Sequence, residues 1–137
     1  MIRLYISPSC TSCRKARKWL QEHDLKFVEK NIFHIPLSKD EIKEILSLTD
    51  EGTKEIISYR SKAYQNLDCD LDTLPMSELL DLFIEKPSLL RRPIIMDDLR
   101  LQIGYNDEEI RMFLPRKARN IELAELYDRI ANIEERA

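Results

Sequence analysis

The chain has 137 residues, of which 43% are hydrophobic and 34% are charged, and it holds only 2 glycines and 6 prolines. This composition suits one soluble globular domain and argues against a disordered chain. The net charge of −3 disfavours binding of duplex DNA by the chain alone, because the molecule as a whole repels phosphate.

The sequence shows neither a signal peptide nor a membrane-spanning segment, and this predicts where the protein is located. The N-terminus, MIRLYISPSC, has no apolar core of the kind found in signal peptides. No apolar run approaches the roughly 20 residues that span a bilayer. We therefore expect a cytoplasmic protein without membrane contact, whose three cysteines are not a disulfide framework of the secreted type.

The first 33 residues predict a strand, a helix and a second strand. Apolar residues alternate in IRLYIS from residue 2, and Pro8 ends this strand. A helical spacing of apolar residues begins at Cys13 and runs to about His23. KFVEKNIF, residues 26–33, is rich in β-branched and aromatic side chains. This order is typical of a parallel βαβ unit.

Residues 38–86 are expected to be largely helical. Ser38 with Glu41 three residues later is the signature of a capping box, which opens a helix. Gly52 is expected at the C-cap of that helix. Thr53 is then expected to cap the next helix.

Two further helices are predicted in the same region. The helix that Thr53 begins carries three apolar or aromatic residues, Ile56, Ile57 and Tyr64. Pro75 opens another helix, whose apolar residues are Met76, Leu79, Leu80 and Phe83.

The chain then returns to strands. Residues 94–96 and 101–103 flank a turn at Asp97–Asp98 and predict a β-hairpin. Asn106 starts a helix that continues to Leu114, and a last amphipathic helix is expected over residues 121–133. The whole order is that of a thioredoxin-like α/β fold with a helical insertion. We expect one domain, residues 1–137, with a β lobe (about 1–35 and 88–137) and a helical lobe (about 38–86).

Cys10 and Cys13 form a CxxC motif at the turn from the first strand into the first helix. The free N–H groups and the partial positive charge of a helix N-terminus favour a thiolate there, and Arg14 and Lys15 add to that field. Such a position lowers a thiol pKa from about 8.5 into the range of roughly 3.5–7.5. Thiolates are the form that peroxides and disulfides attack.

Other readings of the motif stay open at this point. A structural zinc site needs four ligands, and the remaining candidates, Cys69, His23 and His34, lack ligand spacing. A thiol–disulfide enzyme is a stronger competitor, because a CxxC after the first strand of a βαβ unit is the thioredoxin-like arrangement. However, no aromatic residue precedes Cys10, and nothing obvious serves as a proton shuttle. Chance spacing is a minority reading, and Cys69 is most simply a residue without a role.

Four stretches, SPSCTSCRKARKWL, EIISYRSKAYQ, RRPIIMDDLRLQIGY and FLPRKAR, together resemble the Spx branch of the arsenate-reductase-like (ArsC/Spx) family. The resemblance covers nearly the whole chain and weakens after about Ala118. It implies an arsenate-reductase-like variant of the thioredoxin fold. It also implies a redox-responsive transcription regulator of low-GC Gram-positive bacteria that needs no cofactor and is not an enzyme.

For the redox site, the resemblance implies that Cys10 and Cys13 form an oxidant-sensing disulfide. It places Arg92 beside the oxidised pair, and it predicts a cis peptide bond between Arg92 and Pro93. The residues alone allow a plainer reading of Arg92, a surface cation paired with Asp97 or Asp98.

For partners, the resemblance implies binding to the C-terminal domain of the RNA polymerase α subunit. Gly52 matches the glycine that contacts this domain, and Arg60 and Lys62 match the basic surface linked to engagement of polymerase and promoter. Without the resemblance, this basic cluster reads as a solvated helix face. Promoter DNA is expected as a partner only within the polymerase complex.

An ATP-dependent protease with its adaptor is a further implied partner. The C-terminal sequence NIEERA departs from the small apolar tail of the best-known family members. The alternative function is an arsenate-reducing or thiol–disulfide oxidoreductase that uses Cys10.

Overall fold

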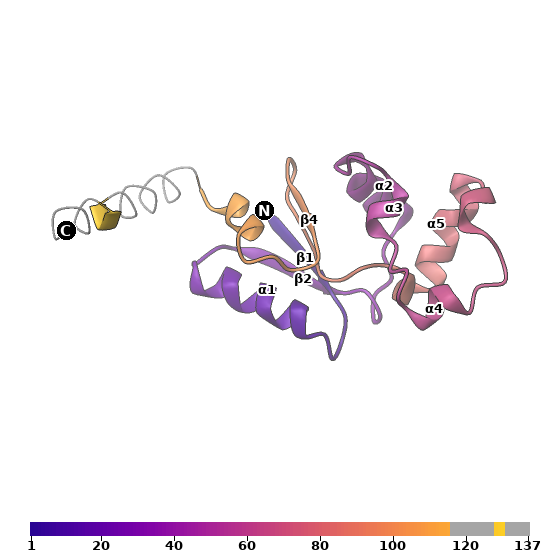
Figure 1. The fold of residues 1–137 in the computed structure, drawn as a ribbon, viewed down its shortest axis with the longest axis horizontal. Helices are drawn as coiled ribbons and strands as arrows, with labels where there is room; N and C mark the ends of the chain where they lie inside the picture. Colours follow the sequence, from indigo (N-terminus) through magenta and orange to yellow (C-terminus); the bar gives the residue numbers. More distant parts are fainter. Residues whose placement is uncertain (116–127, 131–137) are drawn as a thin grey trace.

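The computed structural model describes residues 1–115 and 128–130. Figure 1 shows an elongated arrangement with the sheet and α1 (Thr11–Glu22) at one end and helices α2 to α5 at the other. The predicted helix over residues 121–133 lies outside the described residues, apart from residues 128–130, which are helical. Within the described part, no helix is long and apolar enough to cross a membrane.

The sheet has four strands in the order β2-β1-β3-β4. β1 (Ile2–Ile6) pairs in parallel with β2 (Phe27–Asn31), with Ile2 opposite Phe27, which confirms the predicted βαβ unit. β3 (Ile94–Met96) runs antiparallel to β1 and forms a hairpin with β4 (Leu101–Ile103), at the predicted residues. The sheet is therefore mixed.

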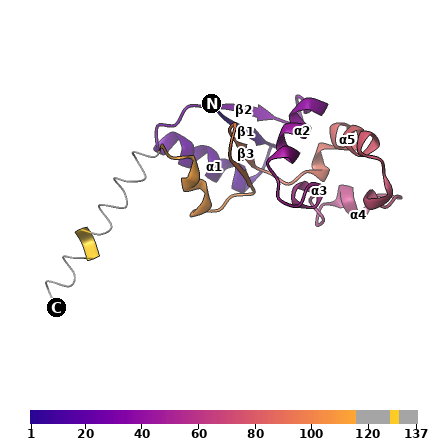
Figure 2. The same ribbon diagram turned by 90° about the horizontal axis from the view of Figure 1, so that it is seen from above.

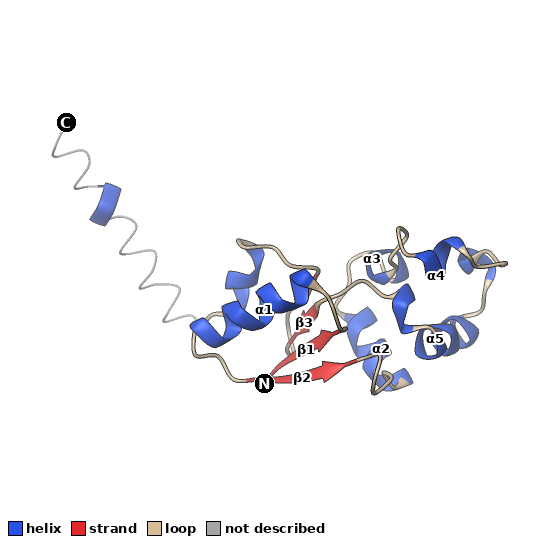
Figure 3. Cartoon of the chain, turned by 90° about the horizontal axis from the view of Figure 1, so that it is seen from below, coloured by secondary structure: helices blue, strands red, loops and turns tan. Residues whose placement is uncertain are grey.

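Two apolar clusters lie on the two faces of the sheet. α1 covers one face (Figure 3), where Leu4, Ala16, Leu20 and Ile95 are fully buried. The other face packs against the helical part of the chain, in a cluster that includes the fully buried Phe83 and Ile94. Since side chains alternate along a strand, Ile94 and Ile95 reach opposite clusters.

The helical part contains α2 (Lys39–Ser47), α3 (Thr53–Ile56), α4 (Lys62–Gln65) and α5 (Met76–Glu85), with short 3₁₀ turns η1 (Leu71–Thr73) and η2 (Pro87–Leu89). Figure 2 shows these helices gathered beside the sheet. The capping box of α2 is confirmed: the Ser38 hydroxyl accepts from the Glu41 N–H at 3.1 Å, and the Glu41 carboxylate accepts from the Ser38 N–H at 3.1 Å. That these helices and the sheet form one domain with two lobes stays a prediction.

The predicted role of Gly52 as a C-cap is wrong. α2 already ends at Ser47 with Leu48 as its C-cap, and Gly52 is the N-cap of α3. Its φ of 79° and ψ of −137° lie in a region that favours glycine. Its N–H donates to the Thr49 hydroxyl at 3.1 Å. Thr53 is the first residue of α3 and does not cap it.

The single helix predicted from Thr53 through Tyr64 is also wrong. The chain leaves α3 after Ile56, because Ile57 forms an antiparallel bridge with Leu90. The Ser58 N–H donates to the Leu89 carbonyl at 2.7 Å, and this hydrogen bond holds residues 57–58 beside residues 89–90.

The helix predicted from Asn106 to Leu114 is shorter and of another kind. It is a 3₁₀ helix, η3 (Glu109–Phe113), and not an α-helix. The Asn106 side-chain oxygen accepts from the N–H groups of Glu108 and Glu109, at 2.9 and 3.0 Å. Asn106 therefore starts this turn as predicted, although the turn is not α-helical.

Candidate functional site

Cys10 is the N-cap of α1, at the end of the loop that follows β1. Ser9 before it has a φ of 56°, which turns the chain sharply into the helix. The Cys10 sulfur accepts a hydrogen bond from the Cys13 N–H at 3.2 Å. The side chain is half-buried and its thiol is free. Cys10 therefore takes the place that a capping serine or aspartate usually fills, and a thiolate there would be stabilised by a backbone donor.

Cys13 lies in the first turn of α1 and points into the core. Only 1% of it is exposed, and it packs in the same cluster as Ala16 and Leu20. Burial, together with the hydrogen bond to Cys10, raises the pKa of the Cys13 thiol to about 12, although a backbone hydrogen bond from Ser7 opposes this. The lowered pKa expected near the helix N-terminus is therefore wrong for Cys13, because desolvation outweighs the helix dipole.

Arg92 precedes Pro93, and the bond between them is cis, as predicted. The Arg92 guanidinium is half-buried, donates to the Pro87 carbonyl at 3.4 Å and lies 4.9 Å from the centre of the Phe33 ring. These contacts replace the ion pair with Asp97 or Asp98 that the sequence also allowed.

Arg92 also interacts electrostatically with the two thiols. Burial lowers the pKa of Arg92, whereas negative charge at Cys10 and Cys13 raises it. In return, the Arg92 charge lowers the pKa of Cys13. The structure thus brings together the three residues predicted for the redox site.

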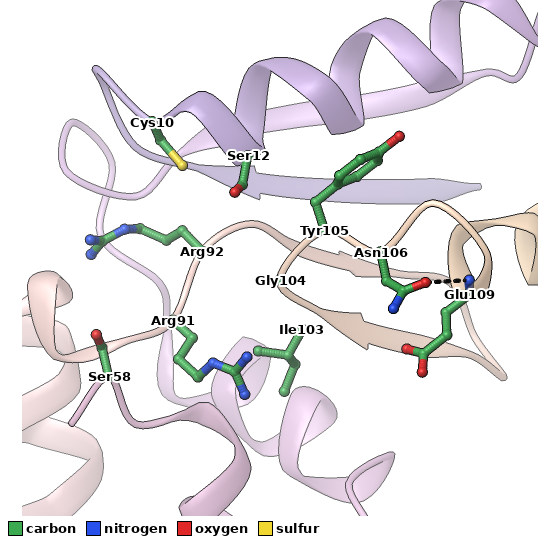
Figure 4. A pocket seen from close by; sticks show the side chains of 10 residues that line it. All are labelled: Cys10, Ser12, Ser58, Arg91, Arg92, Ile103, Gly104, Tyr105, Asn106 and Glu109. Atoms are coloured by element: carbon green, nitrogen blue, oxygen red, sulfur yellow. Dashed lines mark hydrogen bonds between the residues drawn. The ribbon is translucent and has the colours of Figure 1, made fainter. Parts of the chain in front are cut away.

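Figure 4 shows a pocket with Cys10 on one side and Arg91 on the other, and Arg92 and Gly104 between them. Ser58, Asn106 and Glu109 also line it. The sequence reasoning did not single out Arg91, Ser58, Asn106 or Glu109 as site residues. The Arg-Arg pair before Pro93 could have identified Arg91 as a site residue from the sequence. Ser58 and Glu109 reach the pocket wall only because distant parts of the chain pack together.

The residues predicted to bind the polymerase lie on the helical part. Arg60 lies in the turn before α4, Lys62 is the first residue of α4, and both are exposed. A Cβ atom added at Gly52 would meet no heavy atom within 4 Å, so this backbone faces open space. The exposed Tyr59 ring stacks edge-on against Tyr64 at 4.9 Å, which orders the chain around Arg60.

Metal binding was weighed as an alternative use of the cysteines. Among residues 1–115 and 128–130, no three His, Cys, Asp or Glu side chains come together as a metal site. Cys69 is exposed and lies away from the other two cysteines in sequence.

The fold and the thiol site define an arsenate-reductase-like protein of the thioredoxin class, as predicted. The sequence model of the ArsC family matches residues 5–113. Arsenate reductase from Vibrio cholerae superimposes with a TM-score of 0.71, covering 82% of this chain and 97% of its own, at 20% identity, which shows the fold alone.

Closer relatives are curated proteins named global transcriptional regulator Spx. The protein of Listeria innocua is 62% identical over 125 residues, which are 91% of this chain and 95% of the relative. The protein of Bacillus subtilis is 59% identical over 132 residues, which are 96% of this chain and 100% of the relative. The chain therefore belongs to the ArsC family, in its Spx branch.

Proposed function

We propose that this chain is a redox-sensing transcription regulator. It binds the C-terminal domain of the RNA polymerase α subunit and controls genes of the thiol and oxidative stress response through a Cys10–Cys13 disulfide. Relatives 59–62% identical to it are named global transcriptional regulators, which supports regulation of transcription as the general function. The disulfide and the docking partner are the finer parts of the proposal.

The placement of the two thiols carries the sensing part. Cys10 is half-buried at the helix N-terminus beside Arg92, and Cys13 is buried one turn further on. A peroxide oxidises the Cys10 thiolate to a sulfenic acid and leaves as water or an alcohol. The Cys13 sulfur then attacks the Cys10 sulfur, the S–S bond forms, the S–O bond of the sulfenic acid breaks, and one water leaves with the Cys13 proton. This closure is local, since only two residues intervene.

The open space beside the partly exposed Gly52 and the exposed cations Arg60 and Lys62 support the docking part. A partner can approach the Gly52 backbone closely because no side chain covers it. The net charge of −3 fits a regulator that meets promoter DNA only within the polymerase complex. We place the protein in the cytoplasm, where an ATP-dependent protease and its adaptor would limit its amount.

Peptide mapping after mild peroxide treatment and alkylation tests the sensing part. We expect an intramolecular Cys10–Cys13 disulfide with Cys69 left free. Recovery mainly of dimers linked through Cys69 would show that the pair is not the sensor.

A pull-down with the purified α C-terminal domain tests docking. Gly52→Arg should abolish binding in both redox states and leave the Cys10–Cys13 couple intact. Cys10→Ala should retain binding and lose the response to oxidant. Lys62→Gln should weaken binding, and Lys43→Gln, which removes another exposed cation of the helical part, serves as its control and should leave binding unchanged. A folded Gly52→Arg variant that binds with unchanged affinity would refute the docking surface.

The second candidate function is reduction of arsenate or of disulfides. The observation that favours it is the pocket beside Cys10 with two arginines in its wall, which could hold an anionic substrate. Incubation with arsenate or insulin and a thiol reductant separates the two functions. Sustained turnover would support the enzyme, and a single oxidation per chain supports the regulator.

A further inference from the structure

The sheet ends at β4, whose outer edge pairs with no other strand of the described residues. Two backbone hydrogen bonds frame its ladder with β3. At one end, the Gly104 N–H donates to the Pro93 carbonyl at 2.8 Å. At the other end, the Asp97 N–H donates to the Arg100 carbonyl at 3.0 Å. These two bonds establish which backbone groups of β4 face β3.

The backbone groups of Leu101 and Ile103 point away from β3. Hydrogen-bonded and non-hydrogen-bonded pairs alternate along an antiparallel ladder, so the pair midway between the two framing bonds, Ile95 with Gln102, is hydrogen-bonded. The N–H and C=O groups of Leu101 and Ile103 therefore lie on the outer edge. Among the described residues, no hydrogen bond reaches them. β4 thus offers donors and acceptors to another extended chain laid alongside it.

A cavity of about 330 Å³ lies along this edge, and all three residues of β4 belong to its wall. Leu48, also in the wall, packs against the cluster on the helical side of the sheet. Glu109 lines the cavity from η3, whose Ile110 is buried in the cluster on the α1 side. The cavity is therefore space beside the sheet edge, flanked by elements that pack on opposite faces of the sheet.

The wall of this cavity is mainly acidic. Asp50, Glu55 and Glu109 line it, and Arg91 is the cation among its lining residues. Across the described ranges, none of these four side chains makes an ion pair within 4.0 Å. Arg91 instead donates to the Glu55 carbonyl at 3.3 Å. Three carboxylates against one guanidinium leave an excess of negative charge, which is complementary to basic side chains.

We propose that the outer edge of β4 accepts an extended, basic segment of a partner protein as an added strand. The backbone of that segment exchanges hydrogen bonds with Leu101 and Ile103, as in other cases of β-strand addition. Because successive side chains of a strand point to opposite faces, adjacent basic residues reach Asp50 and Glu109. The main-chain bonds supply affinity, and the carboxylates select for positive charge. This interaction rests neither on the thiols nor on the proposed docking at Gly52.

Amide hydrogen exchange, followed by NMR on the ¹⁵N-labelled full-length chain, tests the pairing. The probe is the peptide acetyl-Thr-Val-Arg-Lys-Val-Thr-amide, and its control has Glu in place of Arg and Lys. With the basic peptide at about ten times its Kd, exchange of the Leu101 and Ile103 amides should slow by about tenfold. Exchange of the Gln102 amide, which already bonds to β3, should stay unchanged. The acidic peptide should protect none of them.

Two sets of variants separate the backbone from the charge. Ile103→Pro removes an outward N–H and should weaken binding of the basic peptide by about threefold to tenfold, the size of one hydrogen bond. Ile103→Val retains that N–H and should bind as the parent does. The double variant Asp50→Asn, Glu109→Gln should weaken binding by about threefold to tenfold. Its control, Glu51→Gln with Glu108→Gln, removes two exposed carboxylates outside the cavity wall and should have no effect.

Three results would overturn the inference: no binding of the basic peptide at millimolar concentration, binding without protection of the Leu101 and Ile103 amides, or equal affinity for the basic and acidic peptides. All three are measured on the parent chain, so they stand even if the proline variant does not fold. None of them touches the proposed polymerase docking. That proposal fails on the separate finding that a folded Gly52→Arg variant binds the α C-terminal domain with unchanged affinity.

Discussion

The buried position of Cys13 predicts an unusual pH dependence for closure of the Cys10–Cys13 disulfide. Loading Cys10 with thionitrobenzoate turns closure into one step, in which the Cys13 thiolate attacks Cys10 and releases the coloured thiol. Because the pKa of Cys13 is raised from its ordinary value of 9.0 to about 12, the thiolate fraction rises tenfold for each pH unit below that value. The rate of release should therefore increase about a thousandfold between about pH 7 and pH 10 without levelling off.

Stopped-flow absorbance on the Cys69→Ala chain measures this rate. A Cys13→Ser chain is the control, since it retains the loaded Cys10 but has no second thiol to attack. Circular dichroism at each pH establishes that the fold is intact over the range. A rate that levels off near pH 9 would refute the reasoning, because it would show that Cys13 titrates as a solvated thiol and that its burial does not govern closure.

Three further predictions concern stability. Lys30→Met removes the 2.6 Å partner of the Glu41 carboxylate and should cost about 1 kcal/mol at pH 7 in urea unfolding. Burial raises the pKa of Glu41, but hydrogen bonds from Lys30 and the Ser38 backbone outweigh it, so the net pKa is lowered. This stability is present above the ordinary value of 4.5 and is lost as the pH falls through the lower folded-state value, so parent and variant should converge in acid. Phe83→Ala, at a side chain 1% exposed, should cost about 3–5 kcal/mol in the same assay. Gly104→Ala should cost about 1–2 kcal/mol, because its φ of 81° strains any side chain, and its thermal melt measures this.

The sequence was a good guide where the structure is local. The capping box of α2 depends on Ser38 and Glu41 alone, and it forms as predicted. The hairpin strands appear at the predicted residues because period-two patterning and the Asp97–Asp98 turn act within ten residues of each other. The order strand, helix, strand likewise produced the parallel β1–β2 pair.

The sequence failed where distant segments decide the outcome. Ile57 has the spacing of a helical residue, but it leaves the helix to pair with Leu90, 33 positions away. Cys13 has the position of an activated thiol, yet packing in the α1 core raises its pKa. Gly52 was expected to end one helix and instead begins the next, because α2 already ends at Ser47 and residues 48–51 separate it from Gly52. For Ile57 and Cys13 the competing contact comes from tertiary packing, which local patterns do not contain.

The contacts between the two parts of the chain also limit how far sensing and docking can be independent. Ser58 lies in the wall of the Cys10 pocket and is two residues before Arg60. Its N–H is held by the Leu89 carbonyl at 2.7 Å, and the Arg91 N–H is held by the Ile56 carbonyl at 2.8 Å. The segment that carries Arg91 is therefore tied by backbone hydrogen bonds to the segment that leads to Arg60. Separate control is expected at Gly52, where an added Cβ atom would meet open space, whereas at Ser58 the wall of the thiol pocket and the proposed docking surface share one backbone segment.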